Sequence, residues 1–160
     1  MSSSSQNLQD HHHTRHSGGI TGRLDTVTQA TLHCLLGCTI GEVAGLMIGV
    51  SLGIGVWATM GLATGLAFVT GMSLAVFPLM RREALSFQSA FAAVWIGEVT
   101  SIAVMELAMN ATDYFVGGVA AKSIFEPIFW VGLLAALPAG FVAAWPVNKI
   151  LIGRALKRCH

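Results

Sequence analysis

Charged side chains are scarce in this chain. Lys, Arg, Asp and Glu make up 11% of the 160 residues, against 54% hydrophobic residues, whereas a soluble domain carries roughly 25% charged residues. The formal net charge is only +1. This argues against a nucleic-acid-binding protein, because binding to phosphate backbones is favoured by an excess of Lys and Arg. The composition indicates an integral membrane protein whose main partner is the lipid bilayer.

Enzyme motifs are also missing. The sequence has no glycine-rich nucleotide loop, no nucleophile elbow between a strand and a helix, and no His-Glu-x-x-His motif. Its three cysteines, Cys34, Cys38 and Cys159, form no Cys-x-x-Cys pair. A disulfide between Cys34 and Cys38 would be strained, because the two side chains splay along one helix. We therefore expect no enzyme, and a membrane thiol redox protein is only the third functional hypothesis.

Long apolar runs dominate what the chain does contain. Each of four runs is long enough to cross a bilayer, which takes about 20 residues as a helix. They predict an all-α integral membrane four-helix bundle with no room for a second domain. The predicted spans are residues 30–52, 57–79, 87–110 and 127–150.

Polar segments flank this membrane domain, which we place at residues 25–153. Residues 1–24 are rich in Ser, His and Gly and lack apolar periodicity, which predicts a disordered tail, and Asp25 is the expected helix cap. Residues 154–160 form a basic C-terminal tail. Four histidines in the first tail are either a weak metal collector or solvated residues: His11, His12, His13 and His16.

Basic residues gather at one side of the predicted spans. They precede the first span, follow the second and end the chain, whereas the link between the first two spans has no charge. The positive-inside rule therefore predicts a multi-pass protein of the cell (inner) membrane with both termini in the cytoplasm. In this orientation all three thiols are expected to be reduced. No cleavable signal peptide is expected, because the first apolar run is too long.

A four-residue glycine repeat runs along the first span. In lipid, small residues at this spacing indicate a face where another helix packs closely. Cys34, Cys38 and Glu42 lie within the arc of this face, at 100° per residue, so these polar groups are expected to face protein. The predicted packing residues are Gly37, Gly41, Gly45, Gly49 and Gly53.

A short motif of the first span recurs in the third. Thr39-Ile40-Gly41-Glu42-Val43 is echoed by Trp95-Ile96-Gly97-Glu98-Val99, which predicts two parallel two-helix repeats. Counted from the start of its span, each glutamate lies near the bilayer midplane, where the two could meet. Because a carboxylate at this depth is costly, we interpret Glu42 and Glu98 as functional residues.

The first-span motif resembles that of a known family. The segment His33-Cys34-Leu35-Leu36-Gly37-Cys38-Thr39-Ile40-Gly41-Glu42, with Met105-Glu106 and residues 141–148, is similar to an uncharacterised bacterial family of four-span membrane proteins, the domain of unknown function 4396. The resemblance implies a four-helix membrane bundle and, by genomic association, a loose link to copper handling. It supplies no established activity. Family members often carry a His-rich end, whereas this chain stops at Cys159-His160.

Chemically active side chains form a line through the predicted bundle. Thioethers and thiolates are soft ligands that select Cu(I), and carboxylates at depth carry protons or offset cationic charge. The leading hypothesis is therefore a protein that binds and translocates Cu(I). Taken singly, each Met or Cys is more typical of core packing. From outside to inside, the line consists of Asp113, Met109, Met105, Glu98 with Glu42, Cys38, Cys34, His33 and the end pair Cys159 and His160.

A packing module is the alternative hypothesis. In this interpretation the glycine face binds a membrane partner or a second copy, as an accessory to copper-handling proteins, without transport. Four spans are few for a pathway in one monomer, so a homodimer is expected in either case. Pro138 frees the Leu134 carbonyl and is predicted to kink the fourth span.

The charge asymmetry makes a prediction about orientation. Cytoplasmic reporters fused after His160 and in the loop at Arg81 should be active, whereas the same reporter near Val119 should be inactive, because Lys and Arg stay on the cytoplasmic side. Reporter activity in intact cells measures this. A cytoplasmic signal at Val119 would contradict the assignment.

Overall fold

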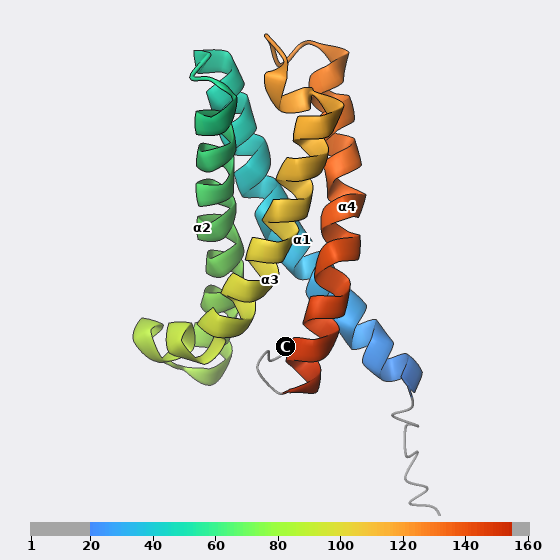
Figure 1. Ribbon diagram of the computed structural model, residues 1–160. Helices are drawn as coiled ribbons and strands as arrows, with labels where there is room; N and C mark the ends of the chain where they lie inside the picture. The colour runs from blue at the N-terminus through green and yellow to red at the C-terminus, as the bar shows by residue number, and fades with distance from the viewer. Residues whose placement is uncertain (1–19, 155–160) are drawn as a thin grey trace, which may run out of the picture.

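The computed structural model describes residues 20–154, apart from the side chains at positions 20, 21 and 23. Within this range, four α-helices are long and apolar enough to cross a membrane, which confirms the predicted all-α bundle (Figure 1). A short 3₁₀-helix precedes the last of them. The helices are α1 (Ile20–Leu52), α2 (Val56–Glu83), α3 (Phe87–Val116), η1 (Gly118–Ala120) and α4 (Pro127–Gly153).

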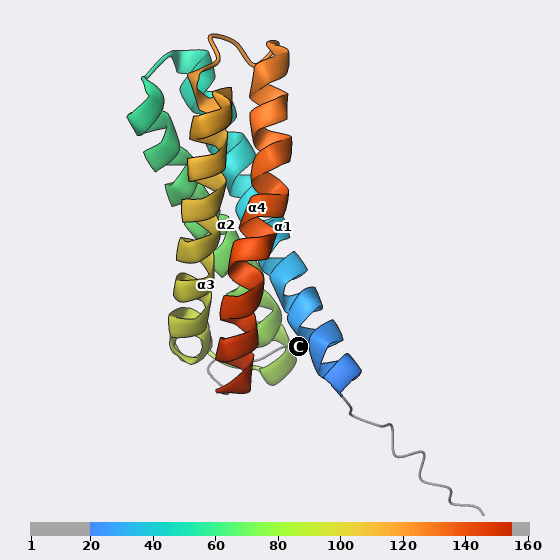
Figure 2. The same ribbon diagram turned by 45° about the vertical axis from the view of Figure 1, so that its right-hand side comes forward.

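The helices alternate in direction, so α1 and α3 run parallel to each other and antiparallel to α2 and α4 (Figures 1 and 2). The α1–α2 and α3–α4 connections lie at one end of the bundle, here called the loop end. The α2–α3 connection and both described chain ends lie at the opposite end, called the terminal end. The most extensive helix contacts are those within the two hairpins.

Backbone conformation explains where the helices stop. Gly53 and Gly55 have φ values of 62° and 88° between α1 and α2, and Gly117 has a φ of 93° at the end of α3. These left-handed conformations suit glycine, which has no Cβ. Ser86 caps α3 by accepting a hydrogen bond from the Ser89 amide at 3.3 Å, and Pro127 occupies the first turn of α4.

The glycine face of α1 packs against α2 of the same chain. A Cβ added at Gly37 would lie 2.8 Å from the Gly71 Cα, and at Gly41 or Gly45 it would meet the α2 backbone. The Thr70 hydroxyl donates a hydrogen bond to the Gly37 carbonyl at 2.7 Å. The predicted close helix contact is therefore confirmed, and its partner is an intramolecular helix.

Two details differ from the sequence expectations. Gly53 packs against no helix of the described chain, because it lies in the α1–α2 turn with open space around it. Its role is conformational. Helix α1 begins at Ile20, so Asp25 lies inside the helix and does not cap it. The polar residues that we assigned to the end of the tail therefore continue the helix beyond the apolar run.

The second hairpin is also closed by glycines. Gly118 and Gly132 approach each other so closely that a Cβ at Gly118 would lie 2.9 Å from the Gly132 Cα. Further along α4, Gly140 packs against Met109, since a Cβ added at Gly140 would lie 2.7 Å from the Met109 sulfur. Helix α4 continues through Pro138, whose side chain is exposed, so the predicted kink stays a prediction.

The glycine contact of α1 and α2 predicts a sharp contrast between two substitutions. Gly45→Leu should destabilise the bundle by about 1–3 kcal/mol or more, because the added side chain meets the backbone and Cβ of Ala63. Gly65→Leu is the matched control, since no described atom outside its own turn of helix lies within 4 Å of a Cβ at Gly65. Thermal unfolding in detergent measures both. Equal melting temperatures for the two variants would contradict this helix contact.

Candidate functional site

The contact between Cys34 and Ser101 shows the register of α1 against α3. The Cys34 Sγ lies 3.6 Å from the Ser101 Oγ, with both residues buried. Glu98 lies three residues from Ser101 toward the terminal end, and Glu42 lies eight residues from Cys34 toward the loop end. At about 1.5 Å per residue, the two glutamates are separated by roughly 16 Å along the bundle. The structure therefore does not bring Glu42 and Glu98 together.

The early start of α1 explains this difference. Measured from Ile20, Glu42 lies 22 residues into its helix, whereas Glu98 lies 11 residues into α3, which begins at Phe87. The apolar run suggests a first helix that starts at residue 30, because the preceding segment is polar. The two copies of the Ile-Gly-Glu-Val motif therefore lie on parallel helices at different levels of the bundle.

Glu106 is the residue that accompanies Glu42. Both side chains are buried, at 2% and 1% exposure, and Glu42 interacts electrostatically with Glu106 and Asp113. Glu106 lies beside the Cys38 thiol and the Thr64 hydroxyl. In the sequence, Glu106 stood out only as part of the family motif. The sequence did contain a signal for Glu106: it lies seven residues before Asp113, so the two side chains point within about 20° of each other on one helix face.

Three of the four buried carboxyl groups of the described residues, Glu42, Glu106 and Asp113, are called the carboxyl line. Four of their oxygens have no hydrogen-bond partner in the part of the chain that the structure describes: Glu42 Oε2, both Glu106 oxygens and Asp113 Oδ1. The chain has no Lys or Arg between residues 23 and 81, 82 and 122, or 122 and 149. Because ionised carboxylates without counter-charge are costly in a bilayer, these groups are suited to hold protons or a cation.

Asp113 lies at the loop end of this line. Its side chain is 3% exposed and is enclosed by Gly118 and Gly132. The Gly117 amide donates a hydrogen bond to the Asp113 carbonyl at 2.9 Å, where α3 turns into η1. A larger residue at Gly118 or Gly132 would meet the Asp113 carboxyl group. The close approach of η1 and α4 therefore buries this acid.

Two thiols and two thioethers meet next to the carboxyl line. Cys34, Cys38, Met105 and Met109 belong to one buried cluster, and none is more than 4% exposed. We call these four residues the sulfur cluster. The two cysteines form no disulfide with each other, and α4 closes the cluster at Gly140, which packs on both methionines. The structure thus gathers four of the predicted soft ligands.

Other predicted ligands lie outside the sulfur cluster. His33 is exposed, and its Nε2 lies 3.3 Å from the Leu74 carbonyl oxygen. Glu98 is buried nearer the terminal end. Among residues 20–154, no three His, Cys, Asp or Glu side chains are placed to hold a metal ion together. Outside the described residues lie Cys159, His160 and the N-terminal histidines His11, His12, His13 and His16.

Residues 141–148, the C-terminal segment of the family resemblance, lie in α4 and form hydrogen bonds to α1. The Asn148 amide donates a hydrogen bond to the Thr31 hydroxyl at 2.9 Å, and the Trp145 Nε1 donates one to the Thr28 hydroxyl at 3.3 Å. Both bonds connect α4 to α1 near the terminal end. This end of α4 therefore positions the half of α1 that carries Cys34 and Cys38.

The buried carboxyl groups make a chemical prediction. Dicyclohexylcarbodiimide adds to protonated carboxylic acids in apolar surroundings, so it should label Glu42 or Glu106 at neutral pH, and labelling should fall as the pH rises. Peptide mass spectrometry locates the label, with the exposed Glu83 as internal control. Glu42→Gln with Glu106→Gln should remove most of the labelling, whereas Glu98→Gln should retain it. The reverse pattern would contradict the site.

Comparison with known proteins identifies the family and nothing more. No curated protein and no solved structure is similar enough to match the chain. The family model described as "Domain of unknown function (DUF4396)" matches residues 25–157, a range that includes all or most of each of the four helices. The chain therefore belongs to the DUF4396 family.

Proposed function

We propose that this protein binds Cu(I) inside the membrane and translocates it between the two ends of the bundle. The observation that carries the proposal is the sulfur cluster, in which two thiols and two thioethers from α1 and α3 share one buried space. Such ligands select Cu(I) over harder cations, which prefer oxygen. The copper ion is the cargo of this process.

The carboxyl line supports a route for a cation from the loop end to the sulfur cluster. Asp113 lies near the loop end, Glu42 and Glu106 lie deeper, and Glu106 lies beside Cys38. Each carboxylate lowers the cost of moving a positive charge into hydrocarbon, because residues 24–80 and 83–121, which carry these acids, include no Lys or Arg that would compete for it. Beyond the cluster, the proposed route continues past Glu98 and His33 toward the terminal end; the predicted end pair, Cys159 and His160, lies outside the described residues.

Metal binding at the cysteines requires a proton balance. When a thiol binds Cu(I), its S–H bond breaks, an S–Cu bond forms and one proton is released. Glu106 lies beside the Cys38 thiol, so the released proton leaves along the carboxyl line. No electron is transferred in this step, and the copper stays Cu(I).

The remaining parts of the proposal concern placement. Both termini lie in the cytoplasm and the protein resides in the cell membrane, in agreement with the basic residues at the terminal end.

The glycine face is covered by α2. A second copy of the chain could therefore not pack against this face, as the alternative hypothesis of a packing module requires. A homodimer would therefore use another face of the bundle.

Copper binding under reducing conditions tests the proposal. Purified protein should take Cu(I) from a weak competing chelator and acidify an unbuffered solution. Cys34→Ser with Cys38→Ser should weaken binding by more than roughly tenfold, about 1.4 kcal/mol, because thiolates are the stronger soft ligands. Met105→Leu with Met109→Leu should weaken it less, and Glu42→Gln with Glu106→Gln should reduce proton release.

Matched controls separate ligand loss from general damage. Met60→Leu with Met72→Leu replaces two partly buried methionines outside the sulfur cluster and should leave the affinity unchanged. Copper flux into proteoliposomes tests movement as opposed to binding. An unchanged affinity in the Cys34/Cys38 double variant, or no binding by the parent protein, would overturn the metal hypothesis.

A further inference from the structure

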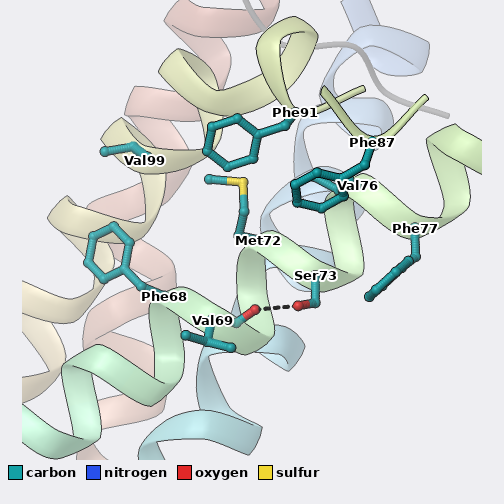
Figure 3. A pocket seen from close by; sticks show the side chains of 9 residues that line it. All are labelled: Phe68, Val69, Met72, Ser73, Val76, Phe77, Phe87, Phe91 and Val99. Atoms are coloured by element: carbon teal, nitrogen blue, oxygen red, sulfur yellow. Dashed lines mark hydrogen bonds between the residues drawn. The ribbon is translucent and has the colours of Figure 1, made fainter. Parts of the chain in front are cut away.

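A lipid-facing groove separates α2 from α3 on the terminal half of the bundle. It has a volume of about 330 Å³. Figure 3 shows the Met72 side chain pointing toward Phe91, with Phe77 at the outer edge. The one hydroxyl among its lining residues, on Ser73, donates a hydrogen bond to the Val69 carbonyl at 2.6 Å. The groove therefore offers an apolar lining.

The length of the groove matches one leaflet of a bilayer. Its α2 wall runs from Phe68 to Phe77, nine residues apart, which span about 14 Å at 1.5 Å per residue. This is about half of the ~30 Å hydrocarbon core. The α3 wall ends at Phe87 and Phe91, whose rings stack at a centroid distance of 6.0 Å. The groove therefore has the dimensions of an acyl chain that enters from the terminal end.

A second hollow continues the groove at the membrane surface. It has a volume of about 510 Å³, shares Phe77 with the groove and is lined also by Pro78, Arg81 and Arg82. Both arginines are in the last turn of α2, where their side chains are exposed. A guanidinium fork matches the geometry of a phosphate group. The hollow thus places two phosphate-binding side chains at the mouth of the groove.

We infer that the groove and the arginine hollow together bind one anionic diacyl phospholipid. An acyl chain lies between α2 and α3, and the phosphate-bearing headgroup contacts Arg81 and Arg82. Basic sites beside membrane helices recognise anionic headgroups in this way. The charge of the arginine pair, next to an apolar groove of one-leaflet length, selects this occupant over a zwitterionic lipid.

Native mass spectrometry of the full chain in an uncharged detergent tests the site. Phosphatidylglycerol and phosphatidylcholine with identical acyl chains are offered as competing probes. The parent protein should retain phosphatidylglycerol about 10- to 30-fold better, as expected for two cations at a membrane surface. Arg81→Gln with Arg82→Gln should abolish this preference without loss of the fold, because both side chains are exposed.

Two further variants make the test specific. Lys149→Gln with Arg154→Gln removes the same charge from the same end of the bundle and should keep the preference. Val99→Trp fills the groove and should reduce adducts of both lipids, while thermal unfolding reports whether the variant is folded. The inference would be overturned if the parent protein retained the two lipids equally, or if inorganic phosphate alone displaced the bound phosphatidylglycerol. It would also be overturned if the arginine variant changed its oligomeric state and kept its lipid.

Discussion

The backbone contact between α1 and α2 is the interaction on which the candidate site depends. Gly37, Gly41 and Gly45 let α1 lie directly against α2, and the polar residues of α1 lie beside this stripe. Once the glycines meet α2, Cys34, Cys38 and Glu42 are turned into the interior toward α3. A lipid environment supplies no hydrophobic drive for this contact, so close van der Waals packing has to hold it.

The interior that results is polar at its centre and apolar elsewhere. Glu42, Glu106 and Asp113 are each at most 3% exposed, and the helix segments that carry them, residues 24–80 and 83–121, contain no Lys or Arg to neutralise them. A packed bundle with only a structural role would be more stable with apolar residues of similar size at these positions. The burial of three acids next to two thiols therefore supports the proposed binding of protons or cations.

Much of the fold could be predicted from the sequence, because membrane helices follow apolar runs of known length. The glycine repeat also indicated a close helix contact correctly. Two boundaries could not be read in this way. Helix α1 starts at Ile20, within a polar segment, and Gly53 continues the four-residue spacing although it lies in a turn. Spacing alone does not show where a helix ends.

The chemistry of individual residues, namely soft sulfur ligands and costly buried acids, was determined by the sequence alone, because side-chain type sets ligand preference and desolvation cost. Which residues meet was decided only by the tertiary structure. The repeated motif favoured Glu98 as the partner of Glu42, yet in the register indicated by the Cys34–Ser101 contact Glu106 is the acid near Glu42. Register depends on how two helices slide along each other, and this sliding is settled by packing between helices that no local pattern encodes.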